Sequence, residues 1–453
     1  MPISIPSFKA YDVRGRLPDQ LNADFAYRIG NATAQYLDAR RVVVGRDIRL
    51  SSAELADAVC RGLTDAGVEV LDIGLGGTES VYFATGTLEA DGGIMVTASH
   101  NPKDYNGLKL VREQSKPISA DTGLKDIQIL AEADDRHIAS AAGKITPTDI
   151  NDLYVQHLLE YIDADALKPL KIVVNAGNGG AGLVLDMLEP HLPFEFVKIN
   201  HAPDGNFPNG VPNPMLTENR ESTARAVVAH KADFGIAWDG DFDRCFFFDE
   251  HGGFIEGYYI VGLLATSILK NAPGAGVVYD PRLTWSTIEM VEAAGGRPVL
   301  SKSGHSFIKQ VMRQEDAAYG GEMSAHHYFR NFFYCDSGMI PWLLIAQIVA
   351  QRGVGLSTLV AERIAKFPAS GEINRRVTDA DAVMADIWAH YESDAVESNR
   401  VDGISLSFAD WRFNLRASNT EPVIRLNVES RADAALMQEK TAALLQQIGG
   451  EPA

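Results

Sequence analysis

A serine and a histidine lie side by side in the stretch TASHNPKDYNGLK, residues 97–109. The apolar run IMV precedes them and turn-forming residues follow, so we expect Ser99 on a loop just after a short buried strand. Ser99 and His100 have the chemistry of a nucleophile and its base. A hydrolase elbow would read G-x-S-x-G, and both glycines are missing here. Taken alone, the stretch is explained equally well by a serine that forms a turn.

Three aspartates alternate with other residues in WDGDFDRC, residues 238–245. On an extended backbone Asp239, Asp241 and Asp243 would all face one side, where their charges repel unless a cation lies between them. Hard oxygen ligands suit Mg²⁺ or Ca²⁺. The calcium-binding EF-hand loop needs a glycine at the position of Arg244, so this motif is not an EF-hand. The pattern therefore favours Mg²⁺, which typically takes part in phosphate chemistry. A solvated acidic turn is the alternative.

Two later stretches carry groups that recognise polar ligands. In YGGEMSAHHYF, residues 319–329, an extended chain would give one face the side chains of Glu322, Ser324 and His326. This mixture of donors and acceptors suits sugar hydroxyls, and a buried hydrogen-bonded cluster explains it equally well. A zinc site is disfavoured because no H-E-x-x-H motif is present.

The stretch RASNTEPVIR, residues 416–425, places a guanidinium, two hydroxyls and an amide in one loop, on Arg416, Ser418, Asn419 and Thr420. A guanidinium binds phosphate through two parallel donors, and hydroxyls complete such a shell. The lysine and glycines of a P-loop are missing, so the stretch does not indicate a nucleotide site.

Composition limits the partners of this chain of 453 residues. Its net charge of −19 argues against nucleic acid or an anionic membrane as a partner, and an anionic substrate would need a local cluster of cations. No apolar run reaches the ~18 residues of a membrane-spanning helix. The N-terminus lacks the apolar core of a secretory signal, and three widely spaced cysteines form no disulfide pattern. We therefore expect a cytoplasmic protein.

Strands alternate with helical segments along most of the chain, and this order restarts twice, at LKIVVNAGNGG and GAGVVYDPRL. Such alternation indicates βαβ units with parallel or mixed sheets. We predict three related α/β domains with mixed sheets and a smaller α+β domain at the C-terminus. The predicted boundaries give domains over residues 1–147, 148–250, 251–367 and 368–453.

Four motifs in order, TASHNP, DGDFDR, GEMSAHH and RASNTEP, resemble those of the α-D-phosphohexomutases, and most closely the bacterial phosphomannomutases and dual-specificity phosphomannomutase/phosphoglucomutases. AYDVRG near the N-terminus and SGH at 303–305 also fit, so the resemblance covers the whole chain. It implies four domains around a central cleft. It also implies an isomerase of nucleotide-sugar and polysaccharide synthesis that interconverts the 1- and 6-phosphates of mannose, and also of glucose.

The resemblance implies a phosphate on Ser99, which passes to the sugar to form a hexose 1,6-bisphosphate that also serves as activator. Mg²⁺ would be held by the phosphoserine, Asp239, Asp241 and Asp243. The sugar would be bound by Glu322, Ser324 and His326, and the distal phosphate by Arg416, Ser418, Asn419 and Thr420. Residues beside the phosphoserine would be His100, Lys109 and Arg244. Further candidates for substrate binding are Tyr11, Arg14, His305, Arg282 and Arg425.

The resemblance leaves the proton-transfer residue open, and the sequence departs from some family members at one position. Lys109 or His305 would assist proton transfer. Arg282 stands where some dual-specificity members have lysine, so its contact does not carry over unchanged.

Rival functions use some of the same residues. A Mg²⁺-dependent sugar phosphatase with a serine nucleophile would release inorganic phosphate, and a phosphosugar-binding protein would not need both Ser99 and the aspartates. A phosphoglucosamine mutase usually has glutamine where Met323 stands. We expect hexose phosphates as the partners, and a monomer or weak dimer.

Overall fold

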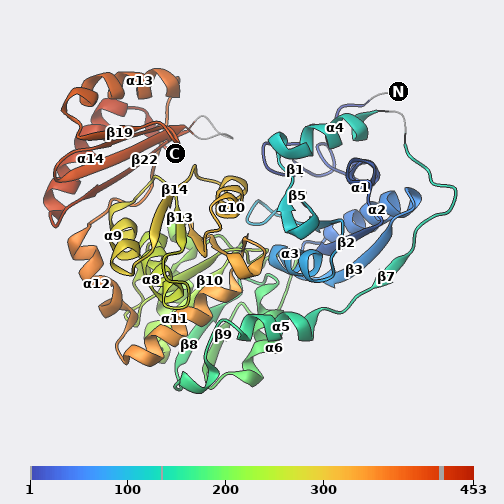
Figure 1. Ribbon diagram of the computed structural model, residues 1–453, viewed down its shortest axis with the longest axis horizontal. Coiled ribbons are helices and arrows are strands. Elements are labelled where there is room, and N and C mark those ends of the chain that lie inside the picture. Colours follow the sequence, from blue (N-terminus) through green and yellow to red (C-terminus); the bar gives the residue numbers. More distant parts are fainter. Residues whose placement is uncertain (1–2, 134–135, 418–422) are drawn as a thin grey trace. The chain divides into compact units, whose positions relative to one another are not determined.

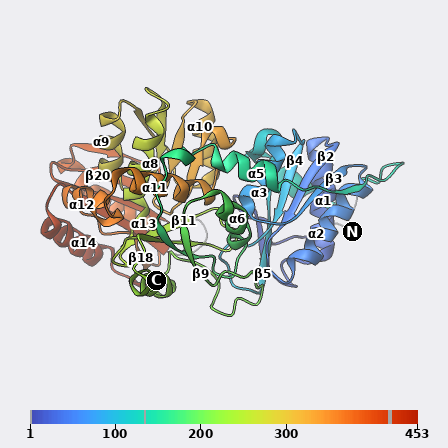
Figure 2. The ribbon, with the colours of Figure 1, turned by 90° about the horizontal axis from the view of Figure 1, so that it is seen from below.

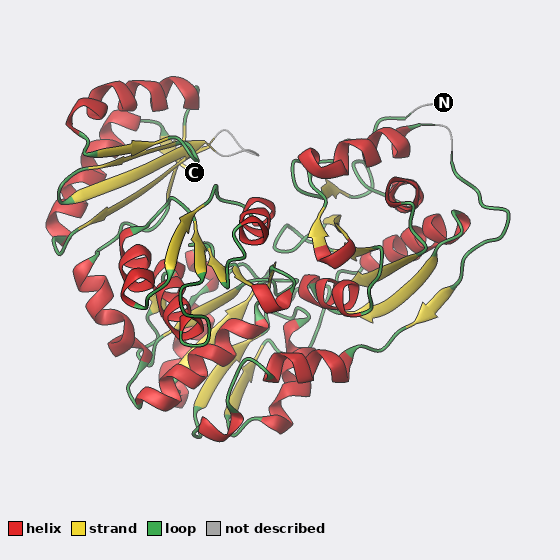
Figure 3. Ribbon diagram, in the orientation of Figure 1, coloured by secondary structure: helices red, strands yellow, loops and turns green. Residues whose placement is uncertain are grey.

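The described chain divides into two compact units in this computed structural model, which describes residues 3–133, 136–417 and 423–453. The first unit contains Met1–Phe254 and His326–Gly353. The second contains Ile255–Ala325 and Val354–Ala453. Figures 1 and 3 show sheets covered by helices in both.

The first sheet carries the serine loop. Its strands lie in the order β1 (Val13–Arg16), β5 (Tyr105–Arg112), β4 (Gly92–Val96), β2 (Arg41–Arg46), β3 (Glu69–Leu75) and β7 (Ile145–Pro147), with β6 (Lys116–Pro117) paired to β5. Strands β4, β2, β3 and β7 run parallel, and β5 is antiparallel to both β4 and β1. The carboxyl ends of β4 and β2 therefore meet at one edge, where ligand-binding loops of such sheets lie.

Helices cover both faces of this sheet, as the run of valines in β2 requires. They are α1 (Ala23–Leu37), α2 (Ser52–Asp65), α3 (Thr78–Thr87) and α4 (Lys125–Glu132). Val42 and Val44 share a core with Val59 of α2, while Val43 between them is also fully buried. Side chains that alternate in direction and are all buried indicate a strand between two layers. Figure 2 shows β2, β3 and β4 side by side within these layers.

The second sheet of the first unit carries the three aspartates. Its strands lie in the order β12 (Phe254–Ile255), β11 (Cys245–Phe248), β10 (Phe234–Trp238), β8 (Lys171–Asn175) and β9 (Glu195–Ile199). Strands β8, β9 and β10 are parallel, and β11 is antiparallel to β10. The helices of this segment are α5 (Asn151–Leu159), α6 (Ala181–Leu188) and α7 (Glu221–His230).

The segment His326–Gly353 also belongs to the first unit. It forms the antiparallel pair β16 (His327–Phe329) and β17 (Cys335–Asp336), followed by the largely buried helix α11 (Met339–Arg352). Trp238 at the end of β10 donates a hydrogen bond to the carbonyl of Gly338 at 2.9 Å. This bond ties the start of α11 to the strand that precedes the aspartates.

The second unit begins with parallel strands β13 (Gly276–Tyr279), β14 (Arg297–Leu300) and β15 (Tyr319–Gly321). Helices α8 (Gly257–Leu269), α9 (Trp285–Ala293), α10 (His305–Gln314) and α12 (Leu356–Lys366) accompany them. Strand β13 lies between β14 and β15, so its carboxyl end, where Arg282 follows, is at the centre of these three strands.

The C-terminal sheet of the second unit is entirely antiparallel. Its strands lie in the order β19 (Glu397–Asn399), β20 (Ile404–Ser407), β21 (Trp411–Ala417), β22 (Val423–Ser430), β18 (Ile373–Arg376) and β23 (Glu451–Pro452). Helices α13 (Ala380–Tyr391) and α14 (Ala434–Ile448) contribute Ile387 and Leu444 to one core with Phe413.

These sheets confirm the predicted fold class of three mixed α/β sheets followed by a smaller α+β domain. The predicted domain boundaries and the central cleft stay predictions. Strand β12 pairs with β11, so the second sheet continues past residue 250. Among the described residues no single helix is long and apolar enough to cross a membrane, and α11 and α12 pass that test only as a bent pair.

Candidate active site

Ser99 lies on the loop that follows β4, as predicted, and its backbone has a φ of +48°. This left-handed conformation is uncommon for a residue other than glycine and persists where its surroundings enforce it. The Ser99 amide donates to Thr97 Oγ1 at 2.9 Å, and the residue is buried. The loop therefore holds the serine in one orientation.

The Ser99 hydroxyl contacts three side chains that carry or accept charge. Its Oγ donates to Asp239 Oδ2 at 2.8 Å and lies 3.0 Å from His100 Nδ1 and 3.2 Å from Arg244 Nη2. Arg244 Nη2 also contacts His100 Nδ1 directly. Burial, assisted by the charge of Arg244, holds the pKa of His100 well below its usual range. The imidazole is therefore neutral, and Ser99 and His100 are in contact as the sequence predicted.

Asp239, Asp241 and Asp243 occupy the turn between β10 and β11, and their oxygens lie within 4.8 Å of one another. We expected an extended backbone here, and that expectation is wrong. The amide of Phe242 donates to the carbonyl of Asp239 at 3.2 Å, and Phe242 has a φ of +47°. The carboxylates converge because the chain folds tightly around them.

Two cations neutralise part of this acidic cluster. Arg244 donates to Asp239 Oδ2 from Nε at 2.9 Å and from Nη2 at 2.6 Å. Lys109, on β5, donates to Asp241 Oδ2 at 2.8 Å and to Asp243 Oδ2 at 2.6 Å. Burial raises the pKa of Asp239 to about 6, although Arg244 opposes the shift.

Asp241 and Lys109 hold each other in their charged forms. Burial alone would raise the pKa of Asp241, but Lys109 outweighs it and lowers that pKa. Burial would likewise lower the pKa of Lys109, but Asp241 and Asp243 outweigh it and raise that pKa. Lys109 is therefore a persistent positive charge and a poor proton acceptor.

The aspartates fit a metal ion. Within the described parts of the chain, Asp241 Oδ1 and Asp243 Oδ1 are buried oxygens with no hydrogen-bond partner. A buried carboxylate oxygen without a donor is costly, and a divalent cation would satisfy both atoms. Three carboxylates form the hard-oxygen ligand set that Mg²⁺ prefers.

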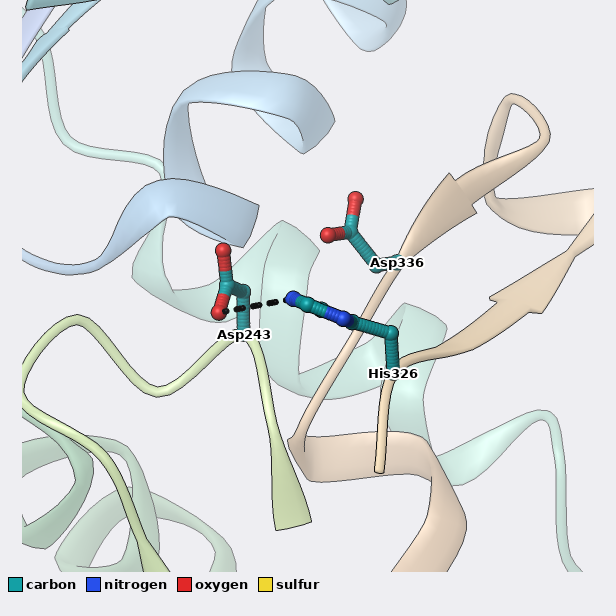
Figure 4. A group of neighbouring side chains, drawn as sticks. All are labelled: Asp243, His326 and Asp336. Carbon is teal, nitrogen blue, oxygen red and sulfur yellow. Dashed lines mark ion pairs between the residues drawn. The ribbon is translucent and has the colours of Figure 1, made fainter. Parts of the chain in front are cut away.

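His326 lies beside the aspartates. Its Nε2 is 3.7 Å from Asp243 Oδ1, and the imidazole points toward that carboxylate with Asp336 nearby (Figure 4). The prediction that His326 shares one extended face with Glu322 and Ser324 is wrong, because residues 322–326 form a turn in which the Ala325 amide donates to the Glu322 carbonyl at 3.0 Å. Glu322 and Ser324 belong to the second unit.

Arg49, which sequence reasoning missed, fixes the serine loop. Its guanidinium donates to the carbonyls of Ser99, Asn101, Pro102 and Tyr105 at 2.9, 2.6, 2.8 and 3.0 Å. The residue is buried and follows β2 at the edge where the serine loop begins. The signal available in the sequence was the stretch GRDIR, residues 45–49, directly after three valines.

The remaining candidates of the first unit lie near β1. Arg14 donates to Asn101 Oδ1 at 2.7 Å and so contacts the serine loop from β1. Tyr11 is partly exposed in the turn before β1.

Arg282 is the centre of the candidate sugar site in the second unit. It forms two parallel bonds with Asp280, at 2.8 and 2.9 Å, and its Nη2 lies 3.4 Å from Glu322 Oε1 and 3.3 Å from Ser324 Oγ. Glu322 also accepts a hydrogen bond from the Gly304 amide at 2.9 Å. Asp280, another residue that sequence reasoning missed, therefore holds Arg282 against the two candidate sugar ligands.

Arg416 and Arg425, the candidate phosphate ligands on β21 and β22, both contact Glu372, at 3.1 and 3.5 Å. Glu372 was not predicted as part of a site. The predicted ligands Ser418, Asn419 and Thr420 lie outside the described residues. His305 is partly buried at the first position of α10.

Family models match four consecutive segments of the chain. They describe phosphoglucomutase/phosphomannomutase α/β/α domains I, II and III, at residues 6–137, 152–253 and 256–367, and the C-terminal domain, at 372–446. The chain therefore belongs to the phosphoglucomutase/phosphomannomutase family. This confirms the predicted resemblance, and the protein is an isomerase of the phosphohexomutase type.

Its relatives extend over the whole chain. It is 62% identical to the phosphohexose mutases of Xanthomonas campestris pv. campestris (strain B100), covering 97% of this chain and 98% of the relative. It is 59% identical to the phosphomannomutase of Salmonella montevideo, covering 98% and 99%. The crystal structure of a phosphoglucomutase/phosphomannomutase family protein from Burkholderia thailandensis matches with a TM-score of 0.87 and 34% identity over 99% of both chains.

The contacts of Arg49 predict that Arg49→Lys lowers kcat for hexose phosphate isomerisation. Lysine keeps the charge but has no planar fork for several carbonyls, so the serine loop loses its fixed position and kcat falls by about tenfold or more. Steady-state kinetics measure this. Arg363→Lys is the control, because Arg363 is also buried and bonds Ser286 and Glu289 in the second unit. Equal losses in both variants would contradict a specific role for Arg49.

Proposed function

We propose that this chain is a phosphomannomutase that interconverts mannose 1-phosphate and mannose 6-phosphate, and also glucose 1-phosphate and glucose 6-phosphate. The observation that carries the proposal is the contact of the buried Ser99 hydroxyl with Asp239 inside a cluster of three carboxylates and two cations. The relatives named phosphomannomutase support mannose as a substrate, and those named phosphohexose mutases support the wider range.

In this proposal Ser99 carries a phosphate. The free hydroxyl of the hexose phosphate attacks that phosphorus, a new sugar O–P bond forms, and the bond between phosphorus and Ser99 Oγ breaks. The hexose 1,6-bisphosphate turns over, and its other phosphate returns to Ser99. Because positioning and charge neutralisation dominate phosphoryl transfer, fixed cations at Arg244 and Lys109 are the contribution expected from the protein. Bisphosphate supplied from solution would phosphorylate Ser99 and act as activator.

Mg²⁺ would be held by Asp239, Asp241, Asp243 and the phosphorylated Ser99. When bound, it supplies positive charge that stabilises the phosphoryl group during transfer. Lys109 is better suited to neutralising charge than to accepting a proton, because Asp241 and Asp243 keep it protonated. We retain His305 as a candidate for proton transfer.

The substrate would be held at both ends. Glu322, Ser324 and His326 would bind the sugar hydroxyls, with Arg282 orienting the first two. Arg416, Ser418, Asn419, Thr420 and Arg425 would bind the distal phosphate, and we retain Tyr11 and Arg14 as ligands near Ser99. We also infer four domains ending near residues 147, 250, 367 and 453, in a cytoplasmic monomer or weak dimer.

The phosphoserine is tested with Ser99→Ala. Incubation with glucose 1,6-bisphosphate should add the mass of one phosphate to the wild type and none to the variant, since the accepting hydroxyl is gone. Isomerisation should fall to background. Ser119→Ala is the control, because Ser119 is a buried loop serine whose hydroxyl contacts Thr122. Near-normal turnover of the Ser99 variant would overturn the mechanism.

The metal site is tested with Asp241→Asn. Loss of one carboxylate charge should weaken Mg²⁺ binding by about tenfold or more, because ligand charge sets the affinity of hard-cation sites. Isothermal titration calorimetry measures this without turnover. Asp186→Asn is the control, since Asp186 contacts Lys198 and His201 at the surface. An unchanged affinity in the Asp241 variant would place the metal elsewhere.

Substrate range is tested by assaying mannose 1-phosphate, glucose 1-phosphate and glucosamine 1-phosphate side by side, with Mg²⁺, a trace of bisphosphate and a monitor of free phosphate. Because mannose and glucose differ at the 2-hydroxyl alone, we expect turnover of both hexoses. Turnover of mannose phosphate alone would restrict the enzyme to that sugar. Phosphate release without isomerisation would assign the site to a phosphatase.

A further inference from the structure

Three arginines of the second unit surround one carboxylate. Glu372 Oε2 lies 3.1 Å from Arg416 Nη2 and 3.7 Å from Arg282 Nη1, and Glu372 Oε1 lies 3.5 Å from Arg425 Nη1. We call Arg282, Arg416 and Arg425 the arginine cluster. Side-chain exposure is 11% for Glu372 and 12% for Arg416, so the contact is shielded from water. The arginines lower the pKa of Glu372 although burial opposes this, and the carboxylate is charged.

The β-sheet register gives a reason for a carboxylate at this place. Arg416 and Arg425 are direct partners across β21 and β22. Like charges directly opposite each other on paired strands repel. Glu372 immediately precedes β18, which pairs with β22, and its carboxylate reaches both guanidinium groups. It therefore screens a repulsion that the sheet would otherwise impose.

Glu372 is not the main counter-ion of Arg282, which forms two parallel bonds with Asp280 and lies 3.4 Å from Glu322 Oε1. Glu372 contacts Arg416 and Arg425 more closely than it contacts Arg282. Among the residues that the structure describes, Arg416 Nε is a buried donor with no hydrogen-bond partner. This donor is available for a second anion. A phosphate accepts the same pair of parallel hydrogen bonds from a guanidinium group as a carboxylate does, and it carries more negative charge.

We propose that Glu372 is a positioning residue that occupies the arginine cluster as a resident carboxylate, and that the distal phosphate of the substrate displaces it from Arg416 and Arg425. This rests on the proposed function, in which Arg416 binds that phosphate. The resident carboxylate keeps the arginines in place between turnovers. It also weakens phosphate binding to the same degree in substrate, intermediate and product, so that the bisphosphate can leave the cluster when it turns.

The test is Glu372→Gln, which keeps the size of the side chain and removes its charge. Inorganic phosphate and mannose 6-phosphate should each bind about tenfold more tightly, a change equivalent to roughly 1.4 kcal/mol. KM should fall while kcat does not rise, because the ligand no longer competes with a carboxylate. Glu289→Gln is the matched control, since Glu289 pairs with Arg363 and Lys366 away from the cluster. It should leave phosphate binding unchanged.

The effect of phosphate on the Tm is a second readout. A purely structural role of Glu372 would not change how much phosphate raises the Tm. Without phosphate, Glu372→Gln should have a lower Tm than the wild type, because the paired Arg416 and Arg425 lose the negative charge of Glu372. Added phosphate should raise its Tm more than that of the wild type. Glu372→Asp keeps the charge but shortens its reach, and its phosphate affinity should lie between the other two. Unchanged or weaker phosphate binding in both Glu372 variants would overturn the proposal.

Failure of this inference and failure of the proposed function are separate results. If the wild type isomerises no hexose phosphate, the proposed function is wrong, yet tighter binding of inorganic phosphate to Glu372→Gln would still establish the competition. If the wild type isomerises normally and phosphate binding does not tighten, the proposed function stands and Glu372 serves only to hold the sheet.

Discussion

Five ionisable side chains are buried around Ser99, and the architecture of the first unit depends on keeping their charges close to balance. Asp239, Asp241 and Asp243 carry more negative charge than Lys109 and Arg244 neutralise. Isolated charges in such an interior would be very costly. The cluster keeps a net negative charge, and among the described atoms Asp241 Oδ1 and Asp243 Oδ1 accept no hydrogen bond. Both features favour the binding of a divalent cation. Asp241 and Asp243 raise the pKa of Lys109 and keep it charged, while burial, assisted by Arg244, lowers the pKa of His100 and keeps it neutral.

This charge balance requires segments that are far apart in the sequence to stay within hydrogen-bonding distance of one another. Strand β5 supplies Lys109, the loop after β4 supplies Ser99, and the turn after β10 supplies the aspartates. The strands from which these segments extend are held in place by the helices that pack on the sheets. Arg49 fixes the serine loop by donating hydrogen bonds to four of its carbonyls. Preorganisation of this kind is how an enzyme avoids reorganising charge during phosphoryl transfer.

The second unit solves a related problem with the opposite sign. An antiparallel register places Arg416 opposite Arg425, and a glutamate before the neighbouring strand compensates. Arg416 and Arg425 contact a carboxylate in this structure, and a phosphate can bind to the same guanidinium groups. Such a pair is suited to the proposed bisphosphate intermediate, which must be held by either of its two phosphates. The carboxylates near Ser99 and the paired arginines of the second unit each carry the charge opposite to that of the ion that their site is proposed to bind.

The sequence by itself determined the family, the order of the strands and helices, and the residues that carry chemistry. Valine runs such as Arg41–Arg46 predict buried strands, because both faces must be apolar, and motifs such as DGDFDR are contiguous. Only the tertiary structure decided how the side chains converge. Asp239 to Asp243 meet through a turn and not through strand alternation, and His326 lies beside Asp243. The polar residues that follow the valines at 42–44 and the DPR motif, which contains Asp280, are local signals for Arg49 and Asp280. The roles of Arg49 and Glu372 come from partners distant in the chain and from cross-strand register, which a one-dimensional pattern does not encode.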